Sequence, residues 1–361
     1  MRRQTFSSLC LLTLGGLLGC GTAPPEPSAP AQAPSPGDPT CANSPLEWLT
    51  RKTLAEDAEV VLEDVTYCSE GLRIRGQICR PQGAEKKPIL SLNHSGVLGV
   101  LDRGTLAGAC AQLARRGFAV FESDFRGEST SEGQVEICLG EVADALNMLS
   151  VANREPYVQP DRVVMMGMSH GGCVVLHALE FGFRPLAAAV LYPPTDFGDA
   201  YRFWQGQLAN GTPFPDPAKL SALLRKVTGG APGDSMAVDT EYARRSPMAE
   251  VALMPLVPTP LFIAQGTADI AVPFWDTCQF AAASGPAVTA FRTTPDGQYV
   301  AESPPALCPQ TSLHWLPAGL NPRDWTNTRY LGIYEGATHG GGPAGPWMLF
   351  DGVGFLQKWT R

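Results

Sequence analysis

The sequence feature that most constrains the fold is the Gly-x-Ser-x-Gly motif Gly167-Met168-Ser169-His170-Gly171. An apolar, β-branched run at 163–166 precedes the motif, and an apolar stretch with helical spacing follows it. This order predicts a strand, a sharp turn and a helix, with the serine hydroxyl exposed at the turn as a nucleophile. Side chains at the two glycine positions would collide across such a tight turn. The remaining chain should therefore contain the partners that a nucleophilic serine needs.

Strands and helices are predicted to alternate through most of the chain. Short apolar and β-branched runs indicate strands at 60–67, 72–78, 88–93, 118–124, 163–166, 186–192, 260–264 and 330–334. Apolar residues at helical spacing indicate helices at 46–54, 101–116, 142–151, 274–283 and 347–359, besides the one after the serine. The alternation predicts an α/β fold, with a mostly parallel sheet and helices on both faces. In such sheets ligands bind beyond the carboxyl ends of the strands.

A serine hydroxyl needs a histidine to take its proton and a carboxylate to hold that histidine in the correct tautomer. The chain has five histidines: His94, His170, His177, His314 and His339. His339 follows the last predicted strand in a glycine-rich loop, and Asp269 follows the strand at 260–264. We therefore predict a triad of Ser169, Asp269 and His339. His177 is expected to be structural, and His314 lies in an irregular segment.

Acyl transfer also needs N–H donors for the oxyanion that develops on the carbonyl oxygen. One predicted donor is the backbone N–H of His170, the residue after the nucleophile. The second should come from the loop after the strand that ends at Asn93; Gly96 is the first candidate and Ser95 the alternate. In the next loop Asp124 and Arg126 are expected to brace the chain by a salt bridge.

Five segments together resemble the dienelactone-hydrolase and prolyl-oligopeptidase-like group of α/β-hydrolases, over roughly residues 56–361. These segments are His94-Ser95-Gly96, Asp124-Phe125-Arg126-Gly127, Gly167-Met168-Ser169-His170-Gly171-Gly172, Gly266-Thr267-Ala268-Asp269 and Gly336-Ala337-Thr338-His339-Gly340. The resemblance implies an α/β-hydrolase fold and a Ser-Asp-His hydrolase that uses no cofactor and no metal. The resemblance also implies that peptidases of this group carry a large propeller domain before the hydrolase domain, and we do not expect one in the sequence before residue 41.

Two insertions interrupt the alternation within a hydrolase domain expected to span residues 41–361. The first, at about 195–249, is predicted to form a lid over the serine. Its aromatic residues Tyr201, Phe203, Trp204 and Phe214 would either line an apolar substrate site or form a small core of the lid itself. The second insertion, at about 286–327, is predicted to be rich in loops.

The N-terminus has the features of an export signal. Arg2 and Arg3 precede a short apolar run, which ends in Leu17-Leu18-Gly19-Cys20. This pattern resembles the bacterial lipoprotein signal, which implies a signal peptide at 1–19 and a lipid on Cys20. Residues 20–40 are rich in Pro, Ala and Ser, so we expect a tether without a core of its own. The predicted protein is exported and anchored to a bacterial membrane through its lipid.

Eight cysteines follow Cys20, and an even number in an exported protein predicts disulfides. Eight cysteines allow 105 pairings, and spacing alone does not choose among them. Cys68 and Cys79 flank a predicted hairpin, and Cys278 and Cys308 bracket the second insertion, so these are the favoured pairs. Cys173, on an apolar helix face, is expected to be a buried free thiol. No cysteine spacing resembles a zinc site.

Composition restricts the class of partner. The formal net charge is −8 and no Lys/Arg-rich patch is present, which argues against nucleic acid. We therefore expect a serine hydrolase that cleaves small-molecule carboxylic esters through an acyl-enzyme. Two alternatives remain open from the sequence. One is a peptidase or amidase of the prolyl-oligopeptidase-like type, and the other is a non-catalytic surface-binding lipoprotein that keeps the fold.

Overall fold

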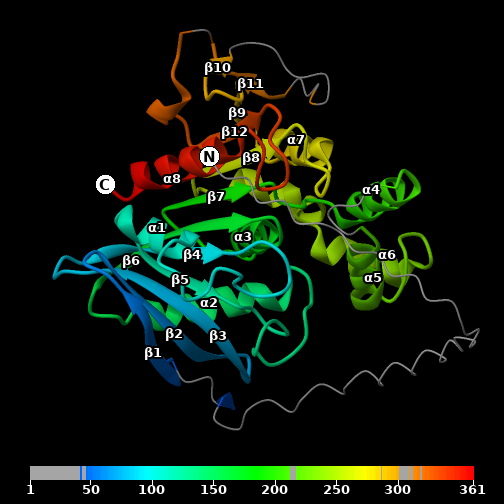
Figure 1. Cartoon of the computed structure of the whole chain (residues 1–361). Helices are drawn as coiled ribbons and strands as arrows, with labels where there is room; N and C mark the ends of the chain where they lie inside the picture. Colours follow the sequence, from blue (N-terminus) through cyan, green and yellow to red (C-terminus); the bar gives the residue numbers. More distant parts are fainter. Residues whose placement is uncertain are drawn as a thin grey trace, which may run out of the picture. The chain divides into compact units, whose positions relative to one another are not determined.

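A computed structural model describes residues 41–42, 46–211, 217–285, 287–300, 308, 312–317 and 319–361. These residues build one mixed sheet of twelve strands (Figure 1). Its strand order is β1-β2-β3-β5-β4-β6-β7-β8-β12-β9-β10, with β11 paired to β9. The strands are β1 (Thr50–Glu56), β2 (Val60–Ser69), β3 (Leu72–Pro81), β4 (Lys87–Asn93), β5 (Ala119–Ser123), β6 (Val158–Met168), β7 (Ala187–Leu191), β8 (Leu261–Gly266), β9 (Thr289–Thr293), β10 (Tyr299–Val300), β11 (His314–Trp315) and β12 (Arg329–Tyr334).

The centre of the sheet is parallel, from β5 through β4, β6, β7, β8 and β12 to β9. Strands β1, β2, β3 and β5 pair antiparallel at one edge, and β10 pairs antiparallel with β9 at the other. The central strands are buried along almost their whole length, as expected for a sheet covered on both faces. The predicted α/β fold with a mostly parallel sheet is therefore confirmed.

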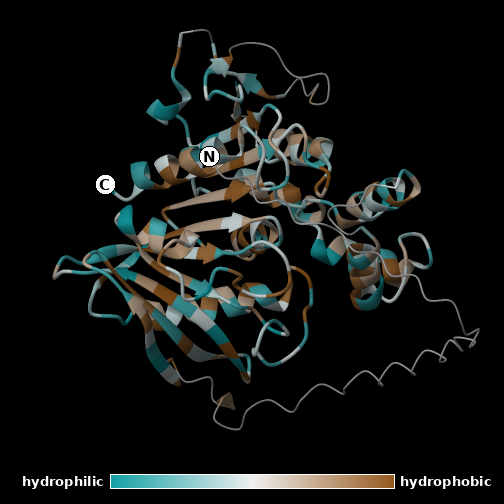
Figure 2. Ribbon diagram, in the orientation of Figure 1, coloured by the Kyte–Doolittle hydropathy of each residue, from teal (hydrophilic) through white to brown (hydrophobic). Residues whose placement is uncertain are grey.

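Helices cover both faces of the sheet. On one face α1 (Ala109–Arg115) packs against β3 and β5, and α8 (Gly345–Trp359) packs against β7, β8 and β12. On the other face lie α2 (Gly140–Ala152), α3 (His170–Glu180) and α7 (Phe274–Ala283). Figure 2 shows hydrophobic residues concentrated on the central strands between these layers. Parallel strands need such crossover helices, which return the chain to the starting edge of the sheet.

A group of lid helices follows β7 and is drawn apart from the sheet (Figure 1). It consists of α4 (Phe197–Ala209), α5 (Pro217–Thr228) and α6 (Met236–Arg245), followed by the 3-10 segment η2 (Pro247–Leu256). Asp196 and Ser235 cap α4 and α6 by accepting hydrogen bonds from Asp199 N–H and Val238 N–H. Tyr201, Leu224 and Tyr242 of the lid belong to a small apolar cluster that also includes Ile137 and Cys173 outside the lid.

Two predictions of local structure were wrong, and one strand was missed. Residues 50–56, within and just beyond the predicted helix at 46–54, form the edge strand β1, since pairing with β2 satisfies their backbone. The helix expected over 101–116 begins only at Ala109, because turns occupy residues 101–107. The insertion at 286–327 contains strand β9, whose Thr-Ala-Phe-Arg-Thr sequence joins the sheet beside β12. The short 3-10 segment η3 (Pro322–Asp324) also lies in this insertion.

The cysteines pair differently from most of the expectations. The disulfides are Cys41–Cys68, Cys79–Cys110, Cys138–Cys173 and Cys278–Cys308. Only the last was predicted correctly. Cys68 and Cys79 are not bonded to each other, although they lie on paired strands, because the β2–β3 register sets Cys68 opposite Arg73 and Cys79 opposite Leu62. Cys173 is buried as expected but is not a free thiol.

The predicted signal peptide at 1–19, the lipidated Cys20 and the tether lie outside the described residues, as does Phe214 of the lid. Among the helices that the structure describes, none combines the length and the apolar character needed to cross a membrane.

Candidate active site

The turn at Ser169 has the geometry that the motif predicts. Ser169 joins β6 to α3 with φ 50° and ψ −117°, a conformation that non-glycine residues rarely adopt. A Cβ on Gly167 would lie 2.1 Å from Gly171 O, and one on Gly171 would lie 2.1 Å from Asn93 O. Neither glycine can therefore be replaced without moving backbone. Such local strain is characteristic of functional turns.

Ser169, His339 and Asp269 come together beyond the carboxyl ends of β6, β12 and β8. His339 Nε2 lies 2.9 Å from Ser169 Oγ, and His339 Nδ1 lies 3.0 Å from Asp269 Oδ2. Because a carboxylate only accepts, His339 Nδ1 carries the hydrogen, and Nε2 is left to accept the serine proton. The three predicted residues thus form one connected hydrogen-bonded chain with the order needed to activate a serine.

Two backbone N–H groups and one side-chain amide fix the orientation of Asp269. Its Oδ1 accepts hydrogen bonds from the N–H groups of Ala271 and Val272 at 2.8 and 2.9 Å. Its Oδ2 accepts one from Gln265 Nε2 at 3.1 Å. The carboxylate is almost fully buried, and these donors compensate for its lost hydration.

The ring of Tyr192 packs beside the His339 imidazole, with ring centroids 4.6 Å apart. Burial, together with the nearby charge of Asp269, raises the pKa of Tyr192 to about 12. Its phenol therefore stays protonated at neutral pH.

The predicted oxyanion donors lie around Ser169. His170 is the first residue of α3, and its N–H belongs to the helical turn that has no acceptors within the helix. Ser95 and Gly96 both line the cavity at Ser169, and Gly96 has φ +80°. The structure brings both loop candidates to the site.

The cavity beside Ser169 has a volume of about 230 Å³ and reaches into the lid. Apolar side chains dominate its wall: Val97, Ile137, Pro194, Phe197, Trp204, Leu220, Leu223, Leu224, Ala271 and Val272. Within the described parts of the chain its lining includes no Asp, Glu, Lys or Arg. Of the lid aromatics weighed from the sequence, Trp204 lines the cavity, whereas Tyr201 packs on Tyr242 inside the lid. Trp204 therefore fits the prediction of an apolar cavity wall, and Tyr201 fits the prediction of a core within the lid.

Several residues of the site could not be identified from the sequence. Ile137 lies in an irregular loop, and both Ile137 and Cys138 have positive φ angles of 58° and 62°. The disulfide from Cys138 to Cys173 attaches this loop to the helix of the nucleophile. Only the even number of cysteines indicated such a link, without indicating the pair.

Other predicted residues have structural roles. Arg126 binds Asp144, Glu70 and Glu136, and Asp124 forms an ion pair with Arg103. Each braces a loop as expected, although the two do not pair with each other. His177 is buried and bonds Arg245 O at 2.9 Å.

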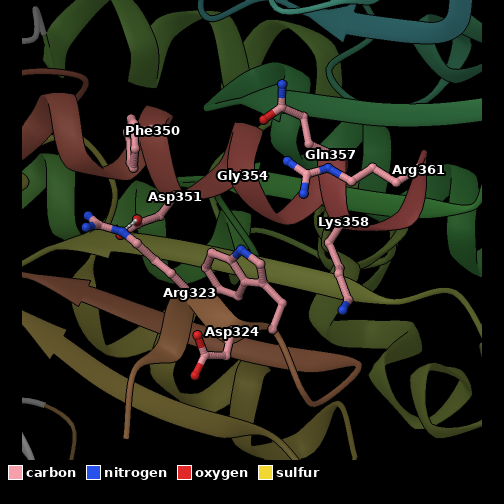
Figure 3. A pocket seen from close by; sticks show the side chains of 9 residues that line it. Arg323, Asp324, Phe350, Asp351, Gly354, Gln357, Lys358 and Arg361 are labelled. Carbon is pink, nitrogen blue, oxygen red and sulfur yellow. Dashed lines mark hydrogen bonds and ion pairs between the residues drawn. The ribbon is translucent and has the colours of Figure 1, made fainter.

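A separate hollow of about 310 Å³ lies beside the C-terminal half of α8 (Figure 3). Charged and polar side chains surround it, among them Arg323, Asp351 and Lys358. Arg323 pairs with Asp351 at 2.7 Å, and Figure 3 shows the two side chains pointing toward each other. The hollow contains no residue of the serine site.

One group of side chains in the described residues has spacing suited to a metal ion: Cys138, His170 and Cys173. Both sulfurs are committed to the disulfide, so they cannot act as thiolate ligands in this state. The group therefore does not fit a resident metal.

Comparison with known proteins places these features in a family. Residues 70–256, just over half of the chain, match the model of the X-Pro dipeptidyl-peptidase (S15) family. The chain belongs to the S15 family. The matched range includes Ser169 but ends before Asp269 and His339.

Relatives of this S15-family chain include peptidases and esterases. An uncharacterized peptidase of Bacillus subtilis, YtmA, is 26% identical over 206 residues, which are 56% of this chain and 72% of that protein. The acylaminoacyl peptidase of Pyrococcus horikoshii superposes with a TM-score of 0.55 at 16% identity over 83% of this chain, but over only 40% of its own. An acetyl xylan esterase from Paenibacillus sp. R4 superposes with a TM-score of 0.59 at 15% identity, over 88% of this chain and 90% of its own. These findings identify a serine hydrolase with the α/β-hydrolase fold.

Proposed function

We propose that the protein hydrolyses carboxylic esters whose acyl group is short, apolar and uncharged. Ser169 attacks the ester carbonyl while His339 takes its proton. His339 then protonates the leaving alcohol, and Asp269 holds the imidazole in the required tautomer throughout. Water, activated by the same histidine, releases the acid from the acyl-enzyme. The support for these roles is the hydrogen-bonded chain from Ser169 to Asp269.

The observation that carries the substrate class is the wall of the cavity. Its volume of about 230 Å³ lies below the range of about 300–1,000 Å³ for sites of drug-sized ligands. A charged acyl group would lose its hydration there without finding a partner of opposite charge in the described lining. A substrate with a free α-amino group next to the scissile carbonyl is therefore disfavoured.

A panel of p-nitrophenyl esters with increasing acyl length tests this function. We expect the highest kcat/KM for short unbranched acyl groups, a decline for long ones, and no activity in Ser169→Ala. Acyl groups that carry an amine or a carboxylate should be poor substrates. Equal hydrolysis by wild type and Ser169→Ala, or a preference for charged acyl groups, would contradict the proposal.

A second candidate is a peptidase or amidase that uses the same groups. The family match favours it, because the matched range at 70–256 belongs to a family of X-Pro dipeptidyl-peptidases. The uncharged cavity suits a blocked or neutral acyl part better than a free N-terminus. Higher kcat/KM for N-acylated aminoacyl anilides than for the matched esters would support this candidate over the first.

A non-catalytic role is the third reading, and a fluorophosphonate probe tests it independently of substrate. The probe reacts with an activated serine whether the natural substrate is an ester or an amide. Labelling of Ser169 in folded protein supports catalysis, and absence of labelling would support the binding module.

We also propose that the protein is exported and carries lipid on Cys20. The four disulfides support an oxidising compartment. Metabolic labelling with an alkyne fatty acid in a bacterial host should mark the wild type and not Cys20→Ser. Labelling of both forms, or of neither, would contradict the anchor.

A further inference from the structure

We propose that the imidazole of His170 is a positioning residue that holds the loop Ser95–Val97 in the orientation needed to bind the oxyanion. The proposal rests on the serine-hydrolase site described above and assigns a role to a side chain whose backbone N–H alone was expected to act. The evidence is a set of contacts that join His170, the oxyanion loop and the wall of the cavity.

His170 Nδ1 lies 2.9 Å from the carbonyl oxygen of Gly96. A carbonyl only accepts, so Nδ1 carries the hydrogen of the ring. His170 Nε2 is then free to accept, and the N–H of Cys138 donates to it at 3.4 Å. Burial lowers the pKa of His170 to about 4, which keeps the ring neutral at pH 7 and preserves this pattern of one donor and one acceptor.

A second imidazole holds the adjacent peptide of the same loop. His94 Nδ1 lies 3.1 Å from Ser95 O, and its Nε2 forms an ion pair with Glu128 Oε2 at 3.0 Å. Burial favours the neutral ring, but the carboxylate of Glu128 outweighs it and raises the pKa of His94. Phe125 contacts both imidazoles, with ring centroids 4.9 Å from His94 and 5.7 Å from His170.

Because each peptide unit is planar, a contact that fixes the direction of its C=O group also fixes the direction of its N–H group. In a trans peptide the C=O and the following N–H point in opposite directions. Holding the carbonyls of Ser95 and Gly96 at the two imidazoles therefore fixes the directions of the Gly96 and Val97 N–H groups. Ser95, Gly96 and Val97 line the cavity at Ser169, where the carbonyl oxygen of a substrate would sit.

The loop needs this external support because its own conformation is weakly determined. Gly96 is exposed, and a Cβ placed on it would meet no atom of the described residues within 4 Å, so none of these neighbours confines it sterically. Glycine also has the widest choice of backbone conformations. Transition-state stabilisation by N–H donors depends on their being oriented before the reaction starts. Loss of the Nδ1–H contact should therefore reduce kcat while leaving binding of the apolar acyl group intact.

Three substitutions distinguish the contact at Nδ1 from the contact at Nε2. In His170→Asn a side-chain amide can still donate near the Nδ1 position, whereas in His170→Gln the amide reaches the Nε2 position near Cys138. His170→Ala removes both contacts. We expect His170→Ala to lower kcat by about 10–100-fold with KM within about twofold. His170→Asn should recover about tenfold of that loss, and His170→Gln should not.

His177→Asn is the matched control, since His177 is also a buried histidine of α3 but contacts Arg245 O and Glu180 instead. It should lower the melting temperature without lowering kcat. A purely structural role for His170 would give the same pattern, with a lower melting temperature for all three variants and unchanged kcat. That result, or a loss confined to KM, would overturn the proposal. Equal activity of the Asn and Gln variants would overturn it as well.

The rate at which a fluorophosphonate labels Ser169 makes the test independent of the proposed ester substrate. Phosphonylation also places negative charge on an oxygen beside the serine, so the rate should fall in His170→Ala and recover in His170→Asn. If wild type labels but hydrolyses no ester, the proposed substrate fails while this series still decides the role of His170. Labelling of His170→Ala at the wild-type rate would refute that role.

Discussion

The indole N–H of Trp204 donates to the carbonyl oxygen of Ala271 at 2.7 Å. Trp204 belongs to lid helix α4, and the N–H of Ala271 is one of the donors that hold Asp269. The lid is thus connected to the carboxylate of the site through one residue and two hydrogen bonds. Trp204 also lines the cavity. Binding of a substrate there and orientation of the proposed triad would therefore depend on the same residue.

Replacing Trp204 with phenylalanine removes this hydrogen bond while keeping an aromatic ring in the cavity. A hydrogen bond of this kind contributes about 1 kcal/mol, so kcat/KM should fall by roughly fivefold. Trp275→Phe is the matched control, because Trp275 contacts Phe203 of α4. Within the described part of the chain, the bond to Ala271 O comes from Trp204 and not from Trp275. Steady-state kinetics on a short ester measure both, and an equal effect of the two changes would argue against the connection.

Asp269→Asn should lower kcat by about 10³–10⁴-fold with little change in stability. The amide can no longer enforce the His339 tautomer that leaves Nε2 free for the serine proton. Asp324→Asn, a carboxylate in the segment before β12 and outside the serine site, serves as the control and should behave as wild type. A loss below about tenfold for Asp269→Asn would show that another group orients His339.

Leu223→Ala enlarges the cavity from the side of α5. Each methylene of an acyl chain that gains contact with the apolar wall contributes up to about 0.8 kcal/mol. The preferred acyl length should therefore increase, with a gain in kcat/KM for longer esters and a small loss for acetyl. Leu208→Ala removes a partly exposed leucine of α4 outside the cavity and should leave the acyl preference unchanged. The ester panel distinguishes the two, and a shift in both variants would mean that lid stability, not cavity size, sets the preference.

Asp276 should make the stability of the protein depend on pH. Burial, reinforced by the charges of Asp199 and Asp196, raises its pKa from 3.8 to about 8. The folded state therefore holds this proton more tightly than the unfolded state, and stability falls as pH rises from about 4 to about 8. Asp276→Asn should flatten this decline and be more stable than wild type above about pH 8. Urea unfolding between about pH 4 and about pH 9 tests this, with the exposed Asp239→Asn as control; identical slopes for wild type and Asp276→Asn would contradict it.

Two disulfides of similar loop length should differ in their effect on activity. Cys79–Cys110 joins β3 to α1 across 31 residues, and Cys138–Cys173 joins the cavity wall to α3 across 35. Replacing either pair with alanine should lower the free energy of unfolding by about 2–4 kcal/mol. Only the second replacement should also lower kcat/KM, because Cys138 contacts His170 and adjoins Ile137. Thermal unfolding and ester kinetics, measured on both variants, provide the comparison.

The sequence predicted the elements whose local signals agree with the fold. The motif around Ser169, together with the positions of Asp269 and His339 after predicted strands, was sufficient to predict that the three side chains lie close together. The reason is that the carboxyl ends of parallel strands meet at one edge of the sheet. The edge strand β1 was missed, since its residues are mostly exposed and only pairing with β2 makes them a strand. Three of the disulfides could not be assigned because a pairing depends on strand register and helix docking, which leave no mark in cysteine spacing.

The side-chain role of His170 could not be inferred from the sequence for a related reason. Its partners Gly96 and Cys138 are 74 and 32 residues away, in loops without regular patterns. Local pattern readily assigned the backbone N–H of His170 a function, because that depends only on the turn after the serine. The role of the His170 imidazole depends on which loops the tertiary fold brings next to it.

The Cys41–Cys68 disulfide determines how mechanical tension would enter the domain. Cys41 is buried, and its sulfur is bonded to Cys68 near the end of β2. A pull on the N-terminal segment, such as the proposed lipid anchor would exert, passes from Cys41 directly into Cys68. Residues 42–67, which contain the exposed strand β1, form a closed loop outside this path of force. The edge strand can therefore stay paired under a load that would otherwise peel it from the sheet.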